Sequence, residues 1–268
     1  MPAVEVLAVA NNLIEALRFF GRARADAQIL ERPGVTVILC GLNYAAFNAG
    51  LLSEPVTAGE GELELRIRAA AREFGSRRFR WSYWVCDDFL SPHLRRVAPA
   101  IFARHGLRPL TEAPGMFADR LQTPRRALPT LDCRPVADAA TRSAFVDLMS
   151  AAFDIPPSVS ASIYGAERAW RSDFRGFVGY SDGKAVTSAA STITSGTVGL
   201  YSVATLPGYR RRGFAEAIIR RVAEEAIRSA PAGQPVESTV LQSTWSGLSL
   251  YEQMGYRTVT NFHVYIAD

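Results

Sequence analysis

The chain has 268 residues, of which 48% are hydrophobic and 21% are charged, and its formal net charge is +4. This length favours two domains, and no run approaches the roughly 20 apolar residues that span a bilayer. Lys184 is the single lysine among 30 basic residues, which are interleaved with 26 acidic residues and form no aromatic-studded basic block. We therefore expect neither nucleic acid nor a membrane as a partner.

The cysteines and the N-terminal residues indicate the cellular compartment in which the protein is expected. Cys40, Cys86 and Cys133 are odd in number and far apart, which gives neither a disulfide framework nor a C-x-x-C metal motif. The N-terminus has no basic start before an apolar stretch, because Glu5 and Glu15 interrupt it. We expect a cytoplasmic protein without a metal.

The first half alternates between predicted helices and strands. Helices are expected over 6–21, 62–74 and 92–105, and strands over 35–42, 47–52, 79–86 and 116–121. Residues 122–130 then carry two prolines and two arginines with little apolar periodicity, which is typical of a linker. We divide the chain into an N-terminal domain (1–123), a linker (124–130) and a C-terminal domain (131–268).

In the second half, Asp138 is placed to cap a helix that runs to about Phe153. Further helices are expected over 158–171, from about 214 to a stop at Pro231–Gly233, and over 245–254 with Gly255 as its stop. Strands are expected over 131–136, 177–180, 184–193, 199–205, 236–241, 256–259 and 262–266.

One stretch combines a strand end, a turn and an arginine-rich helix start. Arg210-x-x-Gly213-x-Ala215 follows the strand that ends at Thr205. An apolar stripe then marks the helix: Ala215, Ile218, Ile219, Val222 and Ala226. A helix N-terminus offers unpaired N–H groups and a positive dipole end, so this turn is suited to bind a phosphate group.

Two motifs carry a resemblance to a known family. Arg210-x-x-Gly213-x-Ala215 resembles the R/Q-x-x-G-x-G/A signature of the GCN5-related N-acetyltransferases (GNAT), and Leu250–Tyr256 (LYEQMGY) resembles their late L-Y-E-x-x-G-F/Y segment. The resemblance covers about residues 130–268. It implies an α/β (α+β) fold, here with two tandem GNAT-like domains, each a mixed, mostly antiparallel sheet flanked by helices. The N-terminal copy has no R-x-x-G-x-G/A motif between a predicted strand and a helix start, so we expect it to wall the substrate cleft rather than to bind a second acyl-CoA.

The resemblance also implies a site. The main chain of Val203–Thr205 would bind the pantetheine arm and the thioester carbonyl of acetyl-CoA, and the turn from Arg210 to Glu216 would bind its diphosphate. Tyr251 would protonate the departing thiolate. Thr244 stands where many relatives have an asparagine that bonds the pantetheine. The residues expected to bind the cosubstrate are Val203, Ala204, Thr205, Arg210, Arg211, Arg212, Gly213, Phe214, Ala215, Glu216 and Thr244.

The acceptor side is less defined. Tyr164, Tyr201 and Trp245 are candidates to line the cleft between the halves. Many relatives use a glutamate on the fourth strand as general base, whereas this chain has Tyr201 and Ser202 there. Tyr201, Asp154 or Tyr164, through a water chain, could take that role.

We expect acyl transfer to a primary amine of a small molecule by direct attack in a ternary complex, in a monomer or homodimer. A non-catalytic acyl-CoA-binding protein and a protein N-terminal or lysine acetyltransferase stay open as alternatives.

Overall fold

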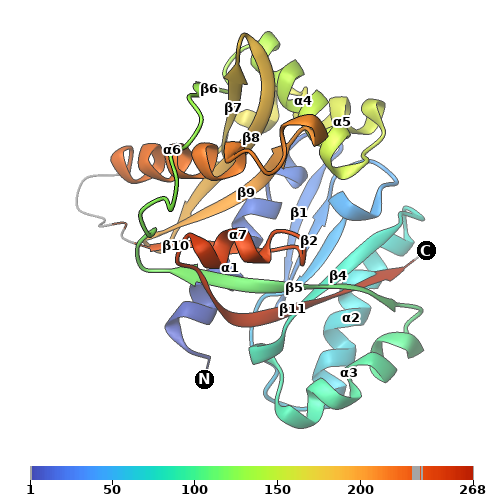
Figure 1. The fold of residues 1–268 in the computed structure, drawn as a ribbon. Helices are drawn as coiled ribbons and strands as arrows, with labels where there is room; N and C mark the ends of the chain where they lie inside the picture. Colours follow the sequence, from blue (N-terminus) through green and yellow to red (C-terminus); the bar gives the residue numbers. More distant parts are fainter. Residues whose placement is uncertain (1, 231–235, 237, 268) are drawn as a thin grey trace.

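A computed structural model describes residues 2–230, 236 and 238–267 (Figure 1). Eleven strands form one mixed sheet in the order β1-β2-β3-β4-β11-β5-β10-β9-β8-β7-β6, with helices on both faces. The expected α/β class, with mixed sheet and flanking helices, is confirmed. The sheets of the two halves are joined into one, which the sequence did not predict.

The N-terminal half follows the predicted order with one addition. Its elements are α1 (Val4–Leu17), β1 (Gln28–Arg32), β2 (Val35–Leu39), β3 (Ala49–Leu52), α2 (Glu60–Gly75), β4 (Trp81–Cys86), α3 (Pro92–Arg104) and β5 (Arg108–Ala118). Strand β1 had no predicted counterpart, because its side chains are exposed or half-buried and it lies at the edge of the sheet. Such a strand lacks the apolar alternation that marks a half-buried one.

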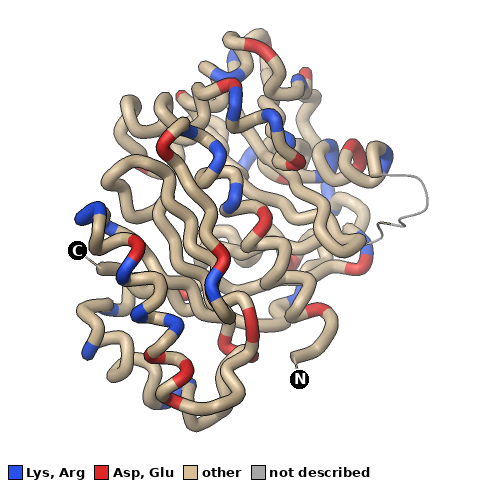
Figure 2. The backbone as a smooth tube through the Cα atoms, turned by 180° about the vertical axis from the view of Figure 1, so that it is seen from behind, with Lys and Arg blue, Asp and Glu red and all other residues tan. Residues whose placement is uncertain are grey.

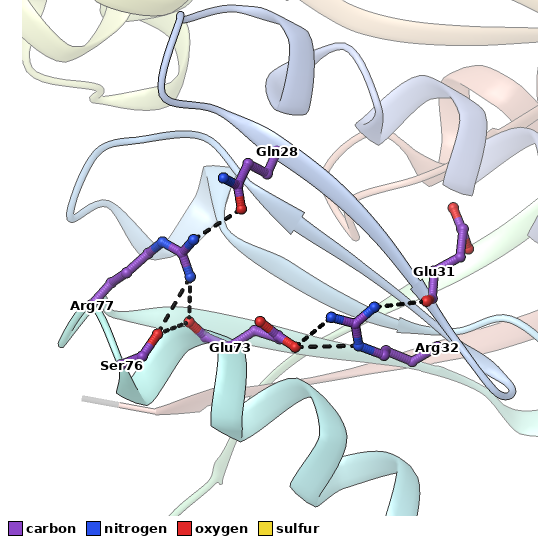
Figure 3. Close-up of polar contacts among 6 residues, drawn as sticks. All are labelled: Gln28, Glu31, Arg32, Glu73, Ser76 and Arg77. Atoms are coloured by element: carbon purple, nitrogen blue, oxygen red, sulfur yellow. Dashed lines mark hydrogen bonds and ion pairs between the residues drawn. The ribbon is translucent and has the colours of Figure 1, made fainter.

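Polar contacts join β1 to the last turn of α2 and to the residues that follow this helix (Figure 3). Arg32 donates from Nη2 to Glu73 Oε1 at 2.7 Å, and Arg77 donates to Gln28 Oε1 at 2.9 Å. Charged side chains and a covering helix are common ways to protect an edge strand from pairing with another chain.

The C-terminal half contains β6 (Asp132–Pro135), α4 (Ala139–Phe153), α5 (Pro157–Tyr164), β7 (Arg175–Ser181), β8 (Lys184–Thr194), β9 (Thr197–Thr205), α6 (Phe214–Arg228), β10 (Ser238–Gln242), α7 (Leu248–Gln253) and β11 (Arg257–Ala267). Asp138 caps α4 as predicted, in a reciprocal capping box with Thr141. The predicted helix stop at Pro231–Gly233 lies outside the described residues.

Two strands cross between the halves. β5, from the first half, lies between β10 and β11, and β11, from the second half, lies between β4 and β5. The β5–β11 ladder extends from Arg257 opposite Phe117 to Ile266 opposite Arg108. Each half therefore completes the sheet of the other. Residues 122–130 form neither helix nor strand, and the division into two domains around them stays our proposal.

Neighbouring residues of β8 show how the two faces of the sheet are covered. Ala189 packs in the apolar cluster that contains Ile218 of α6 and Tyr251 of α7, whereas Ala190 packs with Phe145 of α4 and Tyr164 of α5. Helix α1 also contacts β8 and β9, so a helix of the first half covers strands of the second half.

Charges are interleaved over the molecule. Seen from behind, basic and acidic residues are interspersed over the molecule (Figure 2). Among the described residues, none of the helices combines the length and the apolar character needed to cross a membrane.

Candidate active site

The neighbouring strands β9 and β10 separate part-way along their length. Their parallel pairing runs from Thr197 opposite Ser238 to Gly199 opposite Val240. β9 then continues to Thr205, and β10 continues to Gln242, with no further pairing between the two among the described residues. Diverging carboxyl ends of parallel strands create a crevice at which ligands bind.

A bulge bends β9 as it leaves β10. Ser188 pairs with Ala204 and Ala190 pairs with Tyr201, so two residues of β9 face one residue of β8. Ser202, in the bulge, has a φ of 50°, and its carbonyl accepts a hydrogen bond from Ser188 Oγ at 3.1 Å. The bulge turns the main chain of β9 just before Val203 and Thr205, which are half-buried, while Ala204 is buried.

The turn after β9 opens into the N-terminus of α6. Arg211 has a φ of 63°, and Gly213 is the N-cap residue with a φ of 89°. No side chain of a described residue caps this helix, so the N–H groups of its first turn are free to bind an anion. Phe214 is buried and anchors the helix, whereas the turn residues from Pro207 to Arg212 are largely exposed.

Five cations surround this turn. Arg210 donates from Nε to the carbonyl of Thr205 at 3.1 Å, and the Arg212 guanidinium lies 5.2 Å from the ring centroid of Tyr209. Lys184 Nζ lies 5.5 Å from the same centroid. The set is Arg126, Lys184, Arg210, Arg211 and Arg212. Within the described part of the chain, none of them has a carboxylate as ion-pair partner. The turn therefore carries positive charge that no internal partner neutralises.

Glu216 and Ala215 complete the first turn of α6. Glu216 forms an ion pair with Arg220 at 2.7 Å, one turn further along the helix, and both side chains are largely buried. Ala215 is half-buried. The one carboxylate in this turn is thereby held by an intrahelical partner.

Tyr251 lies on α7, within the apolar cluster that also contains α6. Its side chain is 9% exposed, and its ring meets that of Tyr256 edge to face at a centroid distance of 5.8 Å. Burial raises the pKa of Tyr251 to about 12. The hydroxyl is therefore protonated at neutral pH and can donate a proton.

Thr244 and Trp245 lie in the turn between β10 and α7. Both are exposed, Trp245 at 61%. The Thr244 hydroxyl bonds the Ser246 hydroxyl at 3.0 Å. A large exposed aromatic side chain at the end of a separating strand is available to a ligand.

The two predicted acceptor-side tyrosines both lie near the bulge. Tyr201 donates its hydroxyl hydrogen to Asn12 Oδ1 at 3.0 Å. Tyr164 is buried in the aromatic cluster with Phe145. Burial raises the pKa of each hydroxyl above that of free tyrosine. Both are neutral at physiological pH.

Sequence reasoning missed Tyr44, which the first half brings to the same region. Burial raises the pKa of Tyr44, and the charge of Asp154 raises it further. Asp154 is the exposed C-cap residue of α4, with a φ of 53°. Tyr44 carries no motif, and only the packing of the two halves places it near Asp154.

The corresponding helix start in the first half lies beside a carboxylate of the protein itself. Gly59, with a φ of 85°, is the N-cap residue of α2, much as Gly213 is of α6. Here, however, Glu62 Oε2 accepts hydrogen bonds from the N–H groups of Thr57 and Ala58 at 2.8 and 2.6 Å. This carboxylate therefore bonds the main chain just before the N-cap residue and places negative charge beside the helix start. Glu60 and Glu62 in the first turn are the sequence signal for this difference.

The comparisons with known proteins agree with this geometry. Residues 172–258 match the family model described as an acetyltransferase (GNAT) domain, and this part of the chain is a GNAT domain. No curated protein matches the sequence.

Solved structures show the fold over a longer stretch. A GCN5-related N-acetyltransferase from Kribbella flavida is 18% identical, covers 100% of this chain and 96% of its own, and superposes with a TM-score of 0.70. One from Sphaerobacter thermophilus is 16% identical and covers 99% of this chain and 93% of its own, with a TM-score of 0.57. A tandem GNAT protein from the clavulanic acid biosynthesis pathway is 11% identical and covers 87% of this chain and 78% of its own, with a TM-score of 0.58.

Proposed function

We propose that this GNAT domain belongs to a cytoplasmic acyl-CoA-dependent N-acyltransferase that moves an acetyl or other short acyl group to a primary amine of a small molecule. The observation that carries the proposal is the free N-terminus of α6, surrounded by five cations without carboxylate partners and placed beside the bulged end of β9. A diphosphate supplies the missing negative charge and acceptor oxygens.

The cosubstrate would lie along the gap between β9 and β10. In this arrangement the turn from Arg210 to Glu216 binds the diphosphate, chiefly through main-chain N–H groups. The main chain of Val203–Thr205 binds the pantetheine arm and directs a hydrogen-bond donor at the thioester carbonyl. Such a donor stabilises the oxyanion that forms when that carbonyl is attacked. Thr244, in the turn after β10, would add a side-chain contact.

The chemistry is direct attack within a ternary complex. The amine nitrogen attacks the thioester carbonyl carbon, the carbon–sulfur bond breaks, and the sulfur leaves with the bonding electron pair. Tyr251, whose phenol is protonated at neutral pH, donates its proton to that sulfur as the thiolate forms. Holding both reactants in one cleft supplies part of the rate enhancement by proximity.

The amine must lose a proton before or during its attack. Tyr164 and Tyr201 are poor bases, because burial keeps both hydroxyls neutral and Tyr201 already donates to Asn12. The exposed carboxylate of Asp154 is the better candidate, acting through water. Its position opposite Tyr44 favours an acceptor site between the halves, with Trp245 as a further wall.

Two alternatives remain. The absence of a glutamate at Tyr201 or Ser202 favours a protein that binds acyl-CoA without turnover, and the exposed Trp245 suits a larger acceptor such as a protein N-terminus or lysine side chain. Thiol release from acetyl-CoA, measured with a panel of small amines and then with lysine peptides, separates these cases. We expect release with small amines. Tight coenzyme A binding without release for any acceptor would contradict catalysis, and release with peptides alone would contradict the small-molecule assignment.

A further inference from the structure

A cation from the linker between the halves reaches the turn before α6. Arg126 donates from Nη2 to the carbonyl oxygen of Arg211 at 3.4 Å. The same Nη2 lies 3.7 Å from the point where a Cβ on Gly213 would stand. Arg126 is exposed, and its guanidinium has no carboxylate partner among the residues the structure describes.

Contacts hold the linker in place on both sides of Arg126. Before Arg126, the N–H of Gln122 donates to the carbonyl of Met254 at 2.8 Å, and the Gln122 side chain lies against Gly255. After it, Pro129 Cδ lies 3.1 Å from the same Cβ position on Gly213. The chain is thus held against the end of α7 and against the N-cap of α6, with Arg126 between the two contacts.

A mobile surface arginine would lose side-chain entropy on binding a ligand. A guanidinium already placed at a helix N-terminus loses less, and its planar array of donors suits the oxygens of a phosphate group. The sequence motif of the domain does not include the linker, so this contact arises only from the folded arrangement.

We propose that Arg126 is a further cosubstrate-binding residue, which contacts the diphosphate of acyl-CoA from the linker side while the N–H groups of α6 contact it from the helix side. This inference rests on the proposed function. On this proposal the linker forms one wall of the cosubstrate site, in addition to connecting the two halves of the chain.

The test compares Arg126→Gln with Arg125→Gln, which removes an equal charge from the adjacent linker position, which is also exposed. Calorimetry measures the affinity of each variant for coenzyme A and for 3′-dephospho-coenzyme A, which keeps the diphosphate but lacks the 3′-phosphate. We expect Arg126→Gln to weaken both ligands by the same factor, roughly tenfold or more, and Arg125→Gln to weaken neither by more than about twofold. The loss in Arg126→Gln should shrink as ionic strength rises.

Each other outcome overturns the proposal. Equal affinities in the two variants would show that Arg126 adds nothing specific, and a loss confined to coenzyme A would assign Arg126 to the 3′-phosphate. Arg126→Lys keeps the charge and should retain part of the affinity. If it binds as weakly as Arg126→Gln and both unfold at a lower temperature without ligand, the role is structural. Failure of the unsubstituted protein to bind coenzyme A would instead contradict the proposed function itself.

Discussion

The side-chain amide of Asn12 occupies the space that Gly199 leaves open. A Cβ on Gly199 would stand 1.7 Å from Asn12 Oδ1, and Asn12 Nδ2 donates to the carbonyl of Thr197 at 2.9 Å. Asn12 belongs to α1 of the first half, and Gly199 is the last residue of β9 that pairs with β10. Asn12 also accepts the hydrogen bond of Tyr201. The first half thus holds β9 at the point where the cleft opens.

Gly199→Ala should therefore separate α1 from β9. We expect the free energy of unfolding to fall by about 3 kcal/mol, because the new methyl group meets a buried, hydrogen-bonded side chain in a packed interior. Urea unfolding measures the change. Gly61→Ala in α2, where a Cβ meets no atom within 4 Å, is the matched control and should not destabilise the protein. Equal midpoints for the two variants would contradict the close contact.

Gly213→Ala tests the turn that precedes α6. An L-residue at a φ of 89° costs roughly 1–2 kcal/mol, and the new Cβ would also press on Pro129. We expect coenzyme A affinity to fall, and Gly213→Glu to abolish binding, because its carboxylate repels the diphosphate. Gly208→Ala, in the same turn and with no atom within 4 Å of its Cβ position, should bind as the original does. If calorimetry gave the same coenzyme A affinity for Gly213→Glu as for the unsubstituted protein, the proposed cosubstrate site would be contradicted.

Tyr251→Phe tests proton donation to the leaving sulfur. We expect kcat to fall on the order of 100-fold, the scale of general acid catalysis, with coenzyme A affinity nearly unchanged. The pKa of Tyr251 is raised to about 12, so its ionisation should not shape the rate profile between about pH 6 and pH 9. Steady-state kinetics measure kcat, and calorimetry measures the affinity for coenzyme A. A variant that loses affinity but keeps kcat would assign Tyr251 a packing role.

His263 should make stability depend on pH. Its hydrogen bond to Asp87, at 2.9 Å, and the charges of Asp87 and Glu112 raise its pKa, while burial and Arg95 act in the opposite direction. A raised pKa in the folded state stabilises the protein below the unfolded value of about 6.5, and this contribution is lost as pH rises through the folded pKa. The stability difference between the protein and His263→Gln should therefore be larger at about pH 6 than at about pH 8.5. Denaturant unfolding measures it, and a difference that grows with pH would contradict the assignment.

Strands β5 and β11 each lie in the part of the sheet formed by the other half. We therefore predict that the two halves depend on each other for folding. A fragment of residues 124–268 lacks β5, which separates β10 from β11 in the sheet. We expect this fragment not to unfold cooperatively and not to bind coenzyme A. Co-expression with a fragment of residues 1–123 supplies β5 and should restore both properties. Independent folding and binding by the 124–268 fragment would contradict this prediction.

The features that the sequence predicted well are local ones. The capping box of Asp138, the helix that starts after Gly213 and the stop at Gly255 each depend on backbone preferences and side chains within a few residues. The motif around Gly213 also pointed to the GNAT domain, because phosphate binding at a helix start uses contiguous main-chain groups. The site residues that could be predicted from the sequence therefore lie mainly within one short segment.

The tertiary structure alone decided which distant segments meet. Strands β5 and β11 could each pair with several other strands, and nothing in their local sequence directs each one into the sheet of the other half. The same holds for Asn12 beside Gly199, Tyr44 near Asp154 and Arg126 at the turn before α6. Such contacts join residues far apart in the chain, so they depend on the packing of the whole molecule and leave no periodic signal in either segment.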